Sequence, residues 1–183
     1  TLVRMCASFR NISHAGREMV MTDRTWVGGA TGSFNDPSNW NPPGVPSGDV
    51  SVPGGVNISL ANGVSLNTIE IIGAGTVTFS ALDAYTLYLS TSLTLSSGQG
   101  LSLAGVSLIG SALPQLIGSG TYSITGGTFT FSNIAVASGQ NLILTNTSVT
   151  TSSASGPGTV SLHGSTVSLT GSNPTAIFYF DTG

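Results

Sequence analysis

From residue 56 onward, apolar residues alternate with serine, threonine or asparagine, and glycine or asparagine ends each short stretch. Alternation with a period of two residues predicts β-strands that bury one face. No window carries apolar residues at the helical spacing i, i+3, i+4 and i+7, so no helix is expected. The predicted strands are Val56–Leu60, Thr68–Ile72, Thr76–Phe79, Thr86–Leu89, Leu93–Leu95, Val106–Ile109, Tyr122–Ile124, Thr128–Phe131, Leu142–Leu144 and Val167–Leu169.

Two turn phrases recur between these strands. Gly-x-Gly-Thr begins at Gly73, Gly118 and Gly156, and Ser-Gly-Gln begins between the copies at Ser97 and Ser138. The step from one turn to the next is roughly twenty residues, which is the signature of a stacked repeat. An antiparallel sandwich has no reason to reuse one turn at a fixed step, whereas a parallel β-solenoid does so once per coil.

The chain is therefore expected to be all-β: a single short parallel β-solenoid (β-helix) of about six to seven coils, with an extended N-terminal arm. At about 4.8 Å per coil the rod is roughly 30 Å long. We divide the chain into an arm (residues 1–25), an aromatic and proline-rich cap (residues 26–55) and the solenoid (residues 56–183). Four leucines are expected to stack two coils below four apolar residues at an offset of 41: Leu93, Leu95, Leu101 and Leu103 below Ile134, Val136, Leu142 and Leu144.

The segment from Trp26 to Pro46 reads WVGGATGSFNDPSNWNPPGVP. It resembles the lead-in of many bacterial and phage-encoded parallel β-helix proteins, among them phage capsid decoration and tail-spike proteins and autotransporter-like adhesins. The resemblance implies a cap, in which aromatic rings cover the open end of the first coil and prolines block further strand pairing. An uncovered end would be an exposed sheet edge. A carbohydrate site built on Trp26 and Trp40 is the functional alternative.

Charge is scarce and unevenly placed. Charged residues make up 6% of the chain, there is no lysine, and all four arginines lie within the first 24 residues. From Thr25 onward the only charged residues are acidic, namely Asp36, Asp49, Glu70, Asp83 and Asp181. Without cations the solenoid cannot bind nucleic acid by counterion release, so no nucleic-acid partner is expected.

The candidate chemistry is equally sparse. Glu70 and Asp83 are the only acids within the coils before the C-terminus, and we expect them on different faces, whereas glycoside hydrolysis needs a facing pair. His163 is interpreted as a turn residue. Thr-x-Thr pairs begin at Thr76, Thr128 and Thr145 without recurring in each coil, which argues against an ice-binding array. We predict no catalytic, cofactor-binding or metal-binding residue and no enzyme.

Function is therefore expected at the two ends of the chain. The residues predicted to bind partners are the four arginines of the arm and four residues of the aromatic tail: Arg4, Arg10, Arg17, Arg24, Ile177, Phe178, Tyr179 and Phe180. Low surface charge favours self-assembly, because it gives little repulsion between copies. The single cysteine, Cys6, excludes an internal disulfide framework.

The predicted protein is a non-catalytic virion component, most simply a phage capsid decoration (cement) protein that clamps capsid subunits. Its expected partners are two further copies, forming a homotrimer, and the major capsid protein or another virion subunit. No run of eighteen apolar residues and no secretory signal precede the solenoid, so neither a membrane partner nor export is expected, and assembly would occur in the host cytoplasm. The alternative is a fragment of a secreted bacterial β-helix adhesin or autotransporter passenger at the cell surface.

Overall fold

The computed structural model describes residues 23–110, 114–171 and 177–181. In that part of the chain, strands and turns dominate and the single helical element is a 3-10 turn, η1 (Pro37–Asn39). The strands are β1 (Arg24–Trp26), β2 (Thr31–Ser33), β3 (Trp40–Asn41), β4 (Val50–Pro53), β5 (Asn57–Leu60), β6 (Val64–Ile72), β7 (Gly75–Ser96), β8 (Gln99–Gly110), β9 (Pro114–Ile117), β10 (Gly120–Thr125), β11 (Thr128–Ala135), β12 (Gln140–Thr145), β13 (Ser148–Ser155), β14 (Thr159–His163), β15 (Thr166–Leu169) and β16 (Ile177–Asp181).

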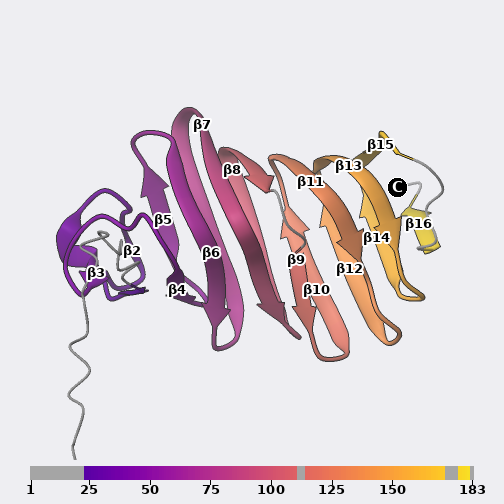
Figure 1. Ribbon diagram of the computed structural model, residues 1–183, viewed down its shortest axis with the longest axis horizontal. Helices are drawn as coiled ribbons and strands as arrows, with labels where there is room; N and C mark the ends of the chain where they lie inside the picture. Colours follow the sequence, from indigo (N-terminus) through magenta and orange to yellow (C-terminus); the bar gives the residue numbers. More distant parts are fainter. Residues whose placement is uncertain (1–22, 111–113, 172–176, 182–183) are drawn as a thin grey trace, which may run out of the picture.

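The strands stack into a rod with three faces, along which the chain advances from one end to the other (Figure 1). Face A contains β2, β5, the start of β7, the start of β8, β10, β12, β14 and β16. Face B contains the start of β6, the middle of β7, the end of β8, the start of β11, the start of β13, and β15. Face C contains β1, β4, the end of β6, the end of β7, β9 and the ends of β11 and β13.

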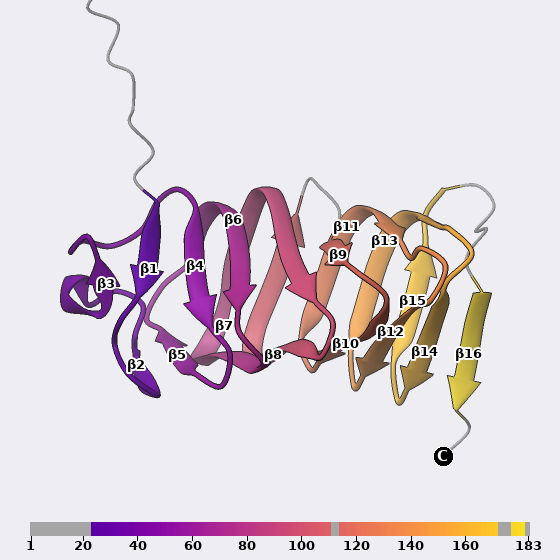
Figure 2. The same cartoon turned by 90° about the horizontal axis from the view of Figure 1, so that it is seen from below.

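Successive strands are paired in parallel along faces A and B, and on face C from β1 to β9 and again from β11 to β13, as β1, β4 and β6 illustrate (Figure 2). Six coils each supply one strand to each of the three faces, and there are five steps from one coil to the next. The coils are residues 50–66, 68–89, 92–110, 114–131, 133–151 and 153–169. The prediction of a short all-β parallel solenoid is confirmed. The parallel ladder also begins before residue 56, because β1 and β4 already belong to it.

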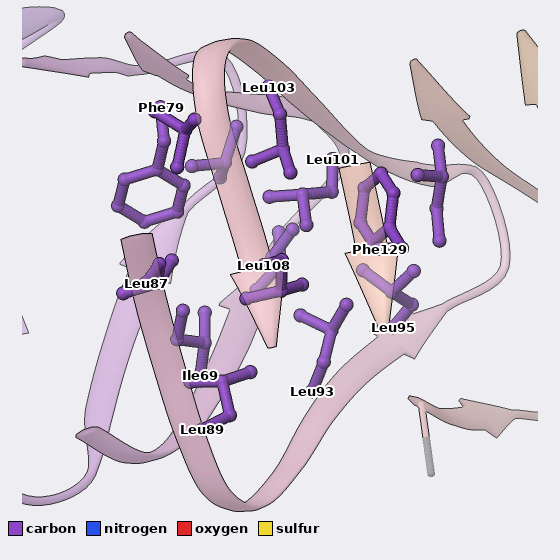
Figure 3. Packing of buried hydrophobic residues seen from close by; sticks show 14 of the residues in the cluster. Ile69, Phe79, Leu87, Leu89, Leu93, Leu95, Leu101, Leu103, Leu108 and Phe129 are labelled. Carbon is purple, nitrogen blue, oxygen red and sulfur yellow. The ribbon is translucent and has the colours of Figure 1, made fainter. Parts of the chain in front are cut away.

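The interior is filled by stacked apolar side chains from all three faces (Figure 3). On face A one ladder runs through Val77, Leu101, Ile124, Leu144 and Leu162, all of them buried. Apolar side chains stacked in adjacent coils thus shield one another from water along the rod axis. This burial of apolar surface is the main source of stability in such a fold.

The same ladder corrects the predicted two-coil offset of 41 residues. Leu101 lies two coils from Leu144, an offset of 43, and Leu142 instead follows Tyr122. Coils differ in length, so register cannot be read from a constant offset. The predicted offset was wrong by two residues. Because side chains alternate between the two sides of a strand, a shift by an even number of residues leaves the apolar side chains facing inward as expected.

The corner that leads into face A is held by a buried glutamine. Gln99 is 5% exposed, and its Nε2 donates to the carbonyl oxygens of Ile71 (2.7 Å) and Gly73 (2.6 Å) in the preceding coil. Its Oε1 accepts a hydrogen bond from the backbone N–H of Ser96 at 2.6 Å. One side chain thus satisfies three backbone groups at the turn between two strands.

Gln140 repeats this arrangement two coils later. It donates to the carbonyl oxygens of Leu116 and Gly118, each at 2.8 Å, and accepts from the N–H of Ala137 at 2.7 Å. Its ladder partner is Gly120, whose φ is +136°. A Cβ at that glycine would lie 2.0 Å from the hydroxyl oxygen of the serine that opens the preceding Ser-Gly-Gln phrase. A glycine in one turn phrase therefore leaves room for the serine of the other phrase in the preceding coil.

Three aromatic rings close the N-terminal end of the rod. Trp40 makes edge-to-face contacts with Trp26, at a centroid distance of 5.1 Å, and with Phe34, at 5.0 Å. The indole N–H groups donate to the carbonyl oxygens of Gly29 and Phe34. Strand β3 runs antiparallel to β1, so the parallel ladder is not continued past β1 on this side.

Candidate functional site

The predicted partner-binding residues do not form one site in the described part of the chain. Arg24 lies on β1, where its guanidinium donates to the carbonyl oxygen of Pro42 and its backbone N–H donates to that of Asp49. It is thus part of the first coil. The other three predicted arginines, Arg4, Arg10 and Arg17, lie outside the described residues.

The four residues predicted in the aromatic tail belong to β16, at the opposite end of the rod. This strand pairs in parallel with β14, so the ladder of face A continues through residues 177–181. Tyr179 is 59% exposed and follows Ser161 in the ladder. Register pairs Phe178 with Val160 and Phe180 with Leu162, two buried residues of the preceding coil, while Ile177 follows Thr159.

A carbohydrate site on Trp26 and Trp40 is contradicted. The two side chains are 3% and 1% exposed, and both indole N–H groups are already bonded to backbone carbonyls. A sugar-binding platform needs an accessible ring face, whereas these rings are packed against each other and against Phe34. Their spacing in sequence is therefore explained by the closure of the rod end.

The acidic residues are dispersed. Glu70 lies on the exposed side of face C, while Asp83 lies at the corner between faces A and B. Among residues 23–110, 114–171 and 177–181, no three histidine, cysteine or acidic side chains come together in a way that could hold a metal ion. The same residues contain no helix long and apolar enough to cross a membrane.

The three Thr-x-Thr pairs lie on two faces. Thr76 and Thr78 are on face A, and Thr128 and Thr130 are on face B. Thr147 is buried, and its hydroxyl donates to the carbonyl oxygens of Ile124 and Thr145, so this residue serves a corner. The pairs therefore do not share one plane.

The feature that sequence reasoning missed is an insertion at the corner between faces A and B. Pairing between β7 and β8 is regular up to Ser80, shifts, and resumes at Tyr85. Residues 81–84 of β7 thus lie opposite the single residue Gly105 of β8. We call residues 81–84 the ledge. In the next coil the same corner is turned with three residues fewer, while toward the preceding coil Ala81 still pairs with Leu60.

The ledge is exposed and lies between two hollows. The relative exposure of Leu82 is 105%, and Asp83 and Ala84 are also exposed. Toward the preceding coil, an open hollow of about 480 Å³ is lined by Leu82, Asp83 and Tyr85 together with Ser59 and Ser80. Toward the following coils, a hollow of about 250 Å³ is bounded by Leu82 and Asp83 again.

Electrostatics at the ledge come from one carboxylate and one phenol. The hydroxyl of Tyr85 donates to the Asp83 carboxylate at 3.2 Å. Desolvation, and then the hydrogen bond and negative charge of Asp83, raise the pKa of Tyr85 above its ordinary value. The Tyr85 ring also packs against the core, so the base of the ledge is anchored while its tip is free.

Exposed apolar residues continue from the ledge onto face B. Tyr88 and Ile109 are adjacent in the ladder, 48% and 37% exposed, and line a further hollow of about 420 Å³. Beyond them the exposed rows of the face carry serine and threonine, such as Thr130 and Thr150. An exposed apolar patch at a solenoid insertion is typical of an interaction surface.

No protein-family model, no curated protein and no solved structure matches this chain.

Proposed function

We propose that this protein is a non-catalytic structural component of a virion, a phage capsid decoration (cement) protein that clamps capsid subunits. The observation that supports the proposal is the ladder itself, a continuous parallel rod whose corners are held by buried side chains. Every buried side-chain nitrogen and oxygen in the described part of the chain has a hydrogen-bond partner. Such a rod resists deformation and offers its ends and corners for attachment.

In this role the solenoid provides rigidity and the N-terminal arm provides attachment. The protein would act as a homotrimer on the surface of the capsid, with the major capsid protein or another virion subunit as its partner. The dispersed carboxylates support a mechanical role, since Glu70 and Asp83 lie on different parts of the rod. The lead-in segment from Trp26 to Pro46 supports the phage class by resemblance.

The test is co-sedimentation of the purified full-length chain with capsids of the phage that encodes it. A variant lacking residues 1–22 is the informative comparison, because Arg24–Trp26 pair with β4 and must be kept. We expect the full chain to sediment with capsids and the truncated chain to remain in the supernatant, with equal thermal unfolding temperatures. Multi-angle light scattering should give the mass of a trimer.

Three outcomes would contradict the proposal. The truncated chain could bind capsids as well as the full chain does. The coding region could lie within a longer reading frame that carries a secretion signal and a membrane anchor, which would favour the adhesin. Oligosaccharide release from capsular polysaccharide would indicate an enzyme.

A further inference from the structure

Three of the four residues of the ledge, Leu82, Asp83 and Ala84, are exposed. Residues 81–84 replace one glycine of the next coil, and Leu82 at their tip is fully exposed. Exposing a leucine forgoes the free energy that its burial would provide. Insertions into single coils of solenoids commonly mark their binding side. A partner that covers Leu82 would recover this free energy.

The chemistry of the ledge specifies the partner. Asp83 lines two of the three hollows and is the one charged residue among all their lining residues, and its carboxylate keeps accepting capacity after the bond from Tyr85. The remaining lining is apolar or carries hydroxyl groups. In the described part of the chain the one arginine, Arg24, already donates to Pro42 and lies on β1. The complementary partner is therefore an extended segment with arginine and large apolar side chains.

The chain contains such a segment in residues 1–22. It has three arginines against one glutamate, whereas residues 23–183 have one arginine against six carboxylates. Apolar side chains lie before and between the arginines, for example Leu2, Met5, Phe9 and Ile12. Twenty-two residues span up to about 70 Å when extended. Along the rod axis the ledge lies two strand spacings, about 10 Å, from β2, and the arm joins the rod at β1 on face C.

We propose that residues 1–22 dock on the ledge, with an arginine on the Asp83 carboxylate and apolar side chains over Leu82 and the adjoining hollow. This inference rests on the role of the arm in the proposed function and names the surface that receives it. A basic, apolar arm on an acidic, apolar corner gains both charge-assisted hydrogen bonds and buried area. Docking on the same copy would hold the arm against its own rod, and docking on a neighbouring copy would join the rods.

Trypsin provides the test, because the chain has no lysine and its four arginines all lie at positions 4 to 24. The enzyme can cut the protein only in or beside the arm. We would follow cleavage of the intact chain after Arg10 and Arg17 by mass spectrometry, with a synthetic peptide of residues 1–22 as the unprotected reference. We expect cleavage of the intact chain to be at least about tenfold slower than that of the peptide.

Two variants and two matched controls locate the contact. Asp83→Asn and Leu82→Ser should each speed cleavage about tenfold, toward the rate of the free peptide. Glu70→Gln removes an exposed carboxylate from face C, and Ile117→Ser removes a side chain that is 52% exposed on the same face. Both controls should be cut at the rate of the unaltered chain, and all variants should unfold at its temperature.

The inference is overturned if the intact chain is cut as fast as the peptide, or if the two controls accelerate cleavage as much as the ledge variants. Protection that persists on dilution indicates docking on the same copy, and protection that is lost indicates a neighbouring copy; both support the ledge as the site. Failure of capsid binding with protection intact would overturn the proposed function alone. Capsid binding by the unaltered chain, with cleavage of its arm as fast as that of the peptide, would overturn the ledge alone.

Discussion

Two corners of the rod, at each of which the chain turns from one face to the next, are built in opposite ways. At the corner between faces C and A, Gln99 and Gln140 are buried and satisfy backbone groups of the adjoining turns. At the corner between faces A and B, residues 82–84 lie outside the ladder and expose a leucine and a carboxylate. A buried polar side chain that is fully bonded indicates structure, whereas an exposed apolar side chain on an insertion indicates contact with a partner.

The largest expected effect is on the glutamine corner. Gln140→Leu keeps the volume of the side chain but leaves the N–H of Ala137 and the carbonyl of Leu116 without its bonds. At about 1–3 kcal/mol for each buried group that loses its partner, we expect the free energy of unfolding to fall by about 2–4 kcal/mol. Urea denaturation at constant m-value measures this.

A surface substitution in the same region is the control. Thr121→Ala, at an exposed position of β10, should change the free energy of unfolding by less than about 0.5 kcal/mol. Equal stability of the Gln140→Leu and Thr121→Ala chains would show that the corner does not depend on the glutamine.

A smaller effect is expected when the ledge is removed. Replacing residues 81–84 by one glycine copies the way in which Gly105 turns the same corner in the next coil. Because a short loop contributes little closure entropy and Leu82 is exposed, the free energy of unfolding should change by less than about 1 kcal/mol. Tryptic cleavage of the arm should accelerate at the same time. A loss of stability as large as that of Gln140→Leu would mean that the ledge is a structural corner.

The smallest effect concerns the phenol beneath the ledge. Because the folded-state pKa of Tyr85 is raised, its contribution to stability is present below the ordinary tyrosine pKa of about 10 and is lost as pH rises through the folded-state pKa. The Tyr85→Phe chain should lack this alkaline component, so its stability should fall less steeply above about pH 10. Tyr88→Phe is the matched control at an exposed position of face B. Identical alkaline profiles of the Tyr85→Phe and unaltered chains would contradict the assignment.

Local pattern was sufficient to predict the strands. Alternation predicted strands at positions such as Thr76–Phe79 and Tyr122–Ile124, and both lie in the ladder of face A. Turn phrases at Gly73 and Ser97 predicted the corners. The prediction that aromatic residues close the first coil also agrees with the burial of Trp26 and Trp40.

Register and the ledge could not be predicted in the same way. Residues 80–85 read as an ordinary stretch between two strands, and only the pairing of Ser80 with Ala104 and Tyr85 with Val106 shows that four residues oppose one. The predicted offset of 41 residues was wrong because coil lengths vary. Leu101 and Leu144, which lie two coils apart, are separated by 43 residues. Nor does alternation reveal that Gln99 points inward to serve a turn.

The sequence alone determined that the chain forms short parallel strands, because strand alternation and the glycine requirement of turns depend on neighbouring residues. Tertiary structure decided which residues stack, because register accumulates the lengths of every turn along the rod. It therefore also decided that Gln140 is buried over Gly120 while Leu82 projects into solvent. Which side chains face the interior follows largely from local alternation, whereas the surface that we propose for docking is present only where one coil is longer than the next.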